Sequence, residues 1–293
     1  MTPIDLVHLA ALRDRTSGSP EVVVGLIDGP VAVDHPDLAK QNIRPIPGRF
    51  DGACQRASST ACLHGTFVAG ILSAKRTSAA PAICPDCTLL IRSIFAETTR
   101  QGEMPTADPE ELGQAILDCI DAGAHVVNVS AALAQPTTKG ERTVEAALDY
   151  AAKRGVLVIV AAGNQGTLGS TAITRHPWAL PVVAYNLHGR PTEHSNLGSS
   201  IGRRGIGAPG DGVTSLGAEG KPLTLGGTSA AAPFVTGAVA LLRSEFPNAS
   251  AGHVKLAVTQ PPSRRRTSVV PPLLDAWASF QSLETTHQRR RSH

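Results

Sequence analysis

Residues 21–28 of the chain read EVVVGLID, and this stretch decides the kind of fold that the sequence can form. Its aliphatic residues, from Val22 to Ile27, are interrupted by a single glycine. A strand with one face in water alternates apolar and polar residues, whereas an unbroken apolar run is typical of a strand buried on both faces of a parallel sheet. The stretch therefore predicts a parallel strand that ends in a carboxylate, Asp28.

Apolar runs of the same kind recur along the chain and alternate with helical patterns. The runs are TLLIRSI (88–94), HVVNVS (125–130), VLVIVAA (156–162) and PVVAY (181–185), and the helical patterns cover 63–74, 109–122, 141–154 and 234–246. Repeated strand, helix, strand units predict one doubly wound α/β domain, with a mostly parallel sheet and helices on both of its faces. We expect this domain to cover residues 1–282, and residues 283–293 to form a basic, disordered C-terminal tail.

The composition limits the partners that the chain can have. Of its 293 residues, 42% are hydrophobic and 3% are aromatic, so the core must be mainly aliphatic. A net charge of +3 gives no reason to expect a nucleic-acid partner. No apolar run reaches the roughly 18 residues that span a membrane, and the N-terminus does not resemble a secretory signal. We therefore expect a cytoplasmic protein without a membrane partner. The sequence gives no indication of its oligomeric state.

Four polar side chains stand where predicted strands end or helices begin. Asp28 ends the first run, Asn164 follows the fourth in AAGNQG, His64 lies in CLHGTFVAGIL, and Ser229 lies in GGTSAAAPFVTG. Each has an ordinary structural alternative as a turn residue, a helix cap or a packed histidine. Together they supply what acyl transfer needs: a nucleophile, a base, a carboxylate that orients the base, and a donor to the oxyanion. Their order along the chain, Asp, His, Ser, is that of subtilisin.

Five stretches of the sequence, in this order, resemble the subtilisin-like serine proteases, and the resemblance covers nearly the whole chain. They are GLIDGPVAVDHPDL, HGTFVAGIL, AAGNQG, SNLGSSIGRRGIGAPGDGVTSLG and GGTSAAAPFVTG. Within that family, DGPV, SNLGSSIGRRG and PPLLDAWASFQ are most similar to the cyanobactin-type proteases, which mature ribosomal peptides. The resemblance implies a subtilisin-like three-layer sandwich, catalytic roles for Asp28, His64 and Ser229, and no cofactor. It also implies that Asn164 and the N–H of Ser229 receive the oxyanion.

The resemblance locates a substrate groove as well. The residues that it implies for substrate binding are Ser130, Ala131, Ala132, Leu133, Ala162 and Gly163. The family usually has a serine followed by glycines where this chain reads NVSAALAQP, so the added side chains predict a narrowed or reshaped specificity pocket. Two smaller departures are Gly29 with Pro30, in place of a small hydroxyl residue and glycine, and Phe67, in place of a second histidine.

Calcium sites are common in the family, and the sequence argues against one of them here. Asp37 matches an aspartate that often binds the ion near the first strand. The loop SAKRTSAAPAICPDC (73–87), however, has few side-chain oxygens before Asp86, and hard cations take six or more oxygen ligands. We therefore expect no metal site.

The expected function is the selective cleavage of a peptide. Only 27 residues precede Asp28, too few for the inhibitory pro-domain of secreted members, so such a domain has been removed or the enzyme is made active. An active enzyme inside the cell must be selective. The main hypothesis is a serine endopeptidase that processes a ribosomally made precursor peptide by removing its leader. The alternatives are a general intracellular subtilisin-like protease and a catalytically quiet peptide-binding subunit.

The five cysteines leave several possibilities open. Cys54 and Cys62 bracket a loop just before His64, and Cys84 and Cys87 form CPDC. These four can form local disulfides, stay free, or together bind a metal ion. Cys119, on a predicted helix, is expected to be a small core residue.

Overall fold

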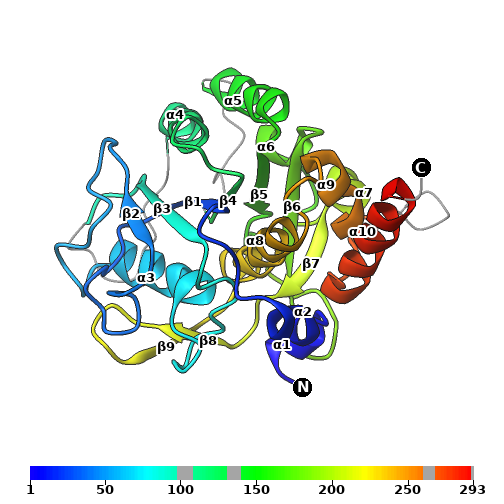
Figure 1. The fold of residues 1–293 in the computed structure, drawn as a ribbon. Coiled ribbons are helices and arrows are strands. Elements are labelled where there is room, and N and C mark those ends of the chain that lie inside the picture. The colour runs from blue at the N-terminus through cyan, green and yellow to red at the C-terminus, as the bar shows by residue number, and fades with distance from the viewer. Residues whose placement is uncertain (98–107, 131–139, 260–267, 292–293) are drawn as a thin grey trace.

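The computed structural model describes residues 1–97, 108–130, 140–259 and 268–291. Its centre is a seven-stranded sheet in the order β2-β3-β1-β4-β5-β6-β7, in which every neighbouring pair is parallel (Figure 1). The strands are β1 (Val23–Asp28), β2 (Ile43–Pro45), β3 (Thr88–Ser93), β4 (Val126–Val129), β5 (Leu157–Ala161), β6 (Ala179–Tyr185) and β7 (Ile206–Pro209). A separate antiparallel pair consists of β8 (Val213–Leu216) and β9 (Pro222–Leu225).

Helices cover both faces of the sheet, as Figure 1 shows, and the prediction of a doubly wound, three-layer α/β domain is confirmed. One aliphatic core cluster joins α4 and α5 to the sheet, and a larger one joins α3 and α8 to its other face. The helices are α1 (Pro3–Leu6), α2 (Ala10–Arg15), α3 (Thr60–Ser73), α4 (Pro109–Asp121), α5 (Glu141–Arg154), α6 (Ala172–Arg175), α7 (Ser199–Arg204), α8 (Thr228–Glu245), α9 (Ala251–Thr259) and α10 (Ala276–Arg291).

The strand order changes direction at β1. From β1 the chain builds one side of the sheet with β2 and β3, and then crosses to β4 and builds the other side. Ligands of open α/β sheets bind outside the carboxyl ends of strands at such a point. Asp28 ends β1, and Ser130, directly after β4, donates its N–H to the carbonyl of Ile27 at 3.3 Å.

Two helices begin earlier than the sequence predicts. The first, α3, begins at Thr60 instead of residue 63, because the side chain of Ser59 caps it by accepting the N–H of Cys62. The second, α8, begins at Thr228 instead of residue 234, and Pro233 lies inside it. Its first N–H, that of Thr228, donates at 2.8 Å to Oδ1 of Asn164, which is 64 residues away in the sequence. A contact so distant along the chain leaves no local signal.

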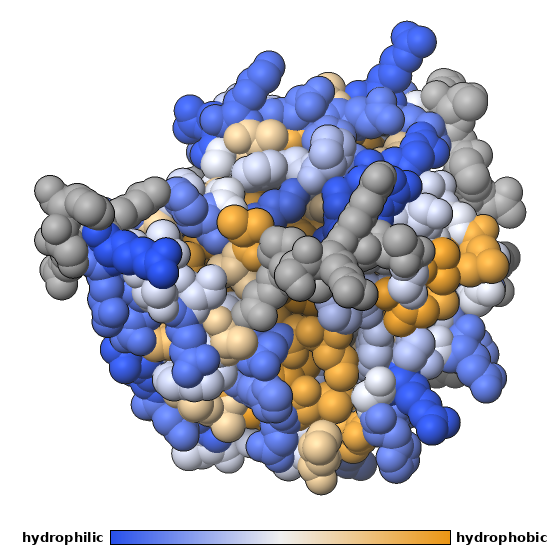
Figure 2. Space-filling view, turned by 90° about the vertical axis from the view of Figure 1, so that its right-hand side faces the viewer, coloured by the Kyte–Doolittle hydropathy of each residue, from blue (hydrophilic) through white to orange (hydrophobic). Residues whose placement is uncertain are grey.

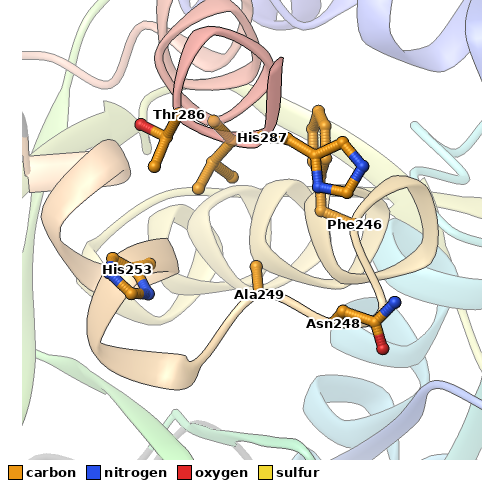
Figure 3. A pocket seen from close by; sticks show the side chains of 7 residues that line it. Phe246, Asn248, Ala249, His253, Thr286 and His287 are labelled. Carbon is orange, nitrogen blue, oxygen red and sulfur yellow. The ribbon is translucent and has the colours of Figure 1, made fainter. Parts of the chain in front are cut away.

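The C-terminal segment differs from the expected disordered tail, because α10 continues as far as Arg291. Trp277, Phe280 and Leu283 recur every three residues and pack on the main core, and the ring of Phe280 lies 5.2 Å from that of Phe246. Beside them, α10 and residues 246–253 enclose a pocket of about 280 Å³ (Figure 3). The face of the molecule that carries α10 also shows an apolar patch bordered by hydrophilic side chains (Figure 2). The basic residues at the C-terminal end therefore belong to a helix that has an apolar face, and their charge hides this face in the sequence.

Candidate active site

The ends of β1, α3 and α8 bring Asp28, His64 and Ser229 into one hydrogen-bonded chain. Nδ1 of His64 lies 2.7 Å from Oδ1 of Asp28, and Nε2 lies 3.0 Å from Oγ of Ser229. A carboxylate can only accept, so Nδ1 carries the proton and Nε2 is left to accept one from the serine. The structure thus brings together the three side chains proposed from the sequence, in the hydrogen-bonded order carboxylate, imidazole, hydroxyl.

Burial and charge tune the base. Asp28 is fully buried and His64 is 8% exposed, whereas Ser229 is half-buried and open to solvent on one side. Burial by itself lowers the pKa of His64, but the negative charge of Asp28 and its hydrogen bond outweigh that effect and raise the pKa above its usual value. The imidazolium that forms when His64 takes the serine proton is therefore stabilised.

Gly29 and Gly65 let the backbone of β1 and α3 come into direct contact. A Cβ on Gly29 would lie 2.0 Å from the carbonyl oxygen of Ala61, and one on Gly65 would lie 2.4 Å from the carbonyl oxygen of Gly29. The usual hydroxyl residue does not fit after the aspartate here, which accounts for this departure from the family pattern. Oδ2 of Asp28 has no hydrogen-bond partner among the described residues, and Oδ1 accepts both from Gly29 N at 2.6 Å and from His64.

Asn164 is fixed to the start of α8 by a residue that sequence reasoning missed, Thr228. Oδ1 of Asn164 accepts from the N–H of Thr228 at 2.8 Å and from its hydroxyl at 3.0 Å. The same hydroxyl accepts the N–H of Gly163 at 3.1 Å. With its oxygen occupied, Asn164 can offer only its Nδ2 hydrogens to a ligand. The N–H of Ser229 belongs to the first turn of α8, whose N–H groups lack intrahelical acceptors. The one signal for Thr228 in the sequence is its position next to Ser229.

The residues proposed for substrate binding are placed less directly. Oγ of Ser130 accepts from Nδ2 of buried Asn128 at 2.7 Å, and the side chain of Ala162 belongs to a small apolar cluster. The N–H of Gly163 donates to the hydroxyl of Thr228. The carbonyls of Ala162 and Gly163 both accept from Asn196, so these backbone groups are engaged within the protein. Ala131, Ala132 and Leu133 lie outside the described residues.

The cysteines form one disulfide, between Cys54 and Cys62, which closes the loop before His64. Cys84, Cys87 and Cys119 are free and buried. The four-cysteine metal site is therefore ruled out, because two of its sulfurs are bonded to each other. Among the described residues one group of three metal-ligating side chains converges, but it consists of this disulfide and Glu97. Cystine sulfurs are not thiolates and are poor metal ligands.

This arrangement can carry out acyl transfer. In that reaction His64 would take the proton from Ser229 as the serine oxygen attacks a carbonyl carbon, and would deliver it to the amine that leaves when the C–N bond breaks. The N–H of Ser229 and Nδ2 of Asn164 are the donors that this arrangement would offer to the developing negative charge. Water would then attack the acyl group on Ser229, with His64 taking the proton of the water and returning it to the serine oxygen as the acid product leaves.

Comparison with known proteins assigns the family. Residues 19–262 match the model of the subtilase family, so the chain belongs to it. Subtilases are serine endopeptidases, the class of enzyme that this fold and site define. A curated relative is fervidolysin from Fervidobacterium pennivorans, which is 30% identical over 271 residues that cover 83% of this chain. The chain spans 37% of the length of fervidolysin and 61% of that of the next curated relative.

Two similar solved structures are those of a patellamide maturation protease, PatA, and a prenylagaramide maturation protease, PagA. The protease domain of PatA, solved as an alanine variant, superposes with a TM-score of 0.83 and is 29% identical, covering 92% of this chain and 97% of that one. The prenylagaramide maturation protease PagA has a TM-score of 0.81 and is 27% identical, covering 94% of this chain and 98% of that one. In the part of the chain that the structure describes, no helix has the length and apolar character needed to cross a membrane.

Proposed function

We propose that this chain is a serine endopeptidase that cleaves a ribosomally made precursor peptide between its leader and its core. The observation that carries the catalytic part is the chain of hydrogen bonds from Asp28 through His64 to Ser229, at 2.7 Å and 3.0 Å. A peptide-binding subunit without catalysis has no need of a buried carboxylate held against a histidine whose pKa is raised.

Two observations support the choice of substrate. PatA and PagA are maturation proteases by name, and each matches this chain over almost its whole length. The sequence NVSAALAQP also has side chains where degradative relatives have glycines in their specificity pocket. A restricted pocket requires affinity from several residues of an extended peptide, paired to the groove as an added strand. Binding energy of this kind orients the scissile bond, so short substrates lose turnover as well as affinity.

The test first searches for a small precursor-peptide gene beside the gene for this chain, and then compares cleavage of that peptide with cleavage of unfolded casein. We expect one clean cut in the precursor, found by mass spectrometry, and slow or no digestion of casein. Ala132→Gly should widen the range of residues that the enzyme accepts at the cleaved position of the substrate. Ser229→Ala should abolish cleavage of both the precursor and casein. Rapid cleavage of casein at many sites by the unmodified enzyme would instead identify a general protease.

A further inference from the structure

Asn196, in the SNLGSS stretch, holds both sides of the loop that carries Asn164. Oδ1 of Asn196 accepts from the N–H of Gln165 at 3.0 Å, and from the N–H and hydroxyl of Thr167, both at 3.1 Å. Its Nδ2 donates to the carbonyl of Ala162 at 3.3 Å and to Oε1 of Gln165 at 2.6 Å. Beyond the end of β5, where strand pairing stops, the carboxamide of Asn196 therefore holds the chain by hydrogen bonds on both sides of Asn164.

The backbone of the loop is shaped to admit this carboxamide. Gly163 has a φ of +105°, which side-chain-bearing residues rarely adopt, and a Cβ there would lie 2.3 Å from Nδ2 of Asn196. The N–H of Asn196 donates to the carbonyl of Gly163 at 2.9 Å, and the N–H of Gly166 donates to the carbonyl of His194 at 2.8 Å. The loop and the turn at 194–196 thus form one hydrogen-bonded unit.

Ser195 attaches this unit to the sheet. It is 3% exposed, and its Oγ lies 3.1 Å from the N–H and 3.3 Å from the carbonyl of Ala184 in β6, and 2.9 Å from the hydroxyl of Thr192. Since β6 pairs with β5, the support of the loop rests on the strand next to the one from which the loop emerges. The position of Asn196 is consequently fixed by the attachment of its neighbour Ser195 to β6.

We propose that Asn196 is a positioning residue of the oxyanion hole, a role that rests on the proposed peptidase function. It fixes the backbone of residues 163–167, while Thr228 fixes Oδ1 of Asn164, so that Nδ2 of Asn164 points to where the oxyanion forms. Preorganised donors lower the barrier only if they are in place before the charge develops. Asn196 therefore acts on the transition state through Asn164 and contributes little to the binding of the peptide.

The experiment measures the second-order rate constant with which a fluorophosphonate probe labels Ser229. As the serine oxygen attacks phosphorus and fluoride leaves, negative charge develops on the phosphoryl oxygen, which occupies the same hole. Asn196→Ala should slow labelling about 10- to 100-fold, the range expected when a catalytic group is misplaced. In an Asn164→Ala background the same substitution should cost no more than about twofold, because a residue that acts through Asn164 is coupled to it. Asn186→Ala is the matched control, since its Oδ1 caps the N–H groups of His188 and Arg190 in a nearby turn. It should label like the wild type.

A melting temperature and a second variant separate an effect on folding from an effect on function. The melting temperature shows whether each variant is folded. Asn196→Asp keeps the three hydrogen bonds that Oδ1 accepts and loses the two that Nδ2 donates, so it should label Ser229 more slowly than the wild type while staying folded. Equal rates for wild type, Asn196→Ala and Asn196→Asp, or the same loss with and without Asn164, would overturn the inference and leave the peptidase assignment intact. An unlabelled wild type would overturn both.

Discussion

Replacing Asp28 with Asn isolates the effect of its negative charge on the proposed reaction. Oδ1 accepts from the N–H of Gly29 and from His64, while Oδ2 has no partner among the described residues. The amide oxygen of the variant can therefore occupy the Oδ1 position, and its NH₂ group can replace Oδ2. His64 keeps its tautomer, and only the attraction between carboxylate and imidazolium is lost. Two unit charges about 4 Å apart attract by roughly 4 kcal/mol at an effective dielectric constant of about 20, which is about 1,000-fold in rate.

The pH profile gives this prediction a second, independent readout. With neutral His64 as the proposed base, the wild type should lose activity as pH falls through a pKa raised above about 6.5. Without the carboxylate only burial acts on the ring, and the pKa falls below that value. The acid limb of the labelling rate at Ser229 should therefore move to lower pH in Asp28→Asn. The exposed Asp34→Asn, with the same change in charge, should change neither rate nor profile. An unmoved acid limb, or a loss below tenfold, would refute the reasoning.

Three further predictions follow from the same geometry. Asn164→Ala should slow acyl transfer by about 100- to 1,000-fold, the range known for such a donor in subtilisin itself, while affinity for a non-cleavable peptide stays unchanged; full activity would make Asn164 a turn residue only. Gly29→Ala should lower both the melting temperature and the labelling rate, because its Cβ would meet the carbonyl of Ala61. Gly252→Ala is the control and should change neither, because its Cβ would have no neighbour nearer than 3.9 Å. An unchanged Gly29→Ala would show that β1 and α3 can move apart without cost. Incubation with EGTA should leave activity and melting temperature unchanged, and a drop of several degrees would reveal a calcium site.

The central sheet could be predicted from the sequence because its strands are buried on both faces. Five apolar runs correspond to β1, β3, β4, β5 and β6, whose residues are nearly all buried. The edge strand β2, with the sequence IRP, and the short pair β8 and β9 are partly exposed and give no such run. The helix α10 was missed because its charged residues conceal an apolar repeat.

The side chains of the candidate site could be picked out from the sequence for a related reason. Asp28, His64, Asn164 and Ser229 are polar groups at the ends of apolar elements, so each stands out in its own neighbourhood. Thr228 and Asn196 do not, since their partners lie 64 and up to 34 residues away in the sequence. Likewise the spacing of the cysteines leaves their pairing open, and only the fold brings Cys54 and Cys62 together.

The central claim is that Ser229 is a nucleophile activated by His64. The most direct test treats native protein with a fluorophosphonate and locates the label by mass spectrometry. The account predicts one label per chain, on Ser229, that is absent from Ser229→Ala and from heat-unfolded protein and is strongly slowed in His64→Ala. Equal labelling of another serine, or equal labelling of native and unfolded protein, would contradict it.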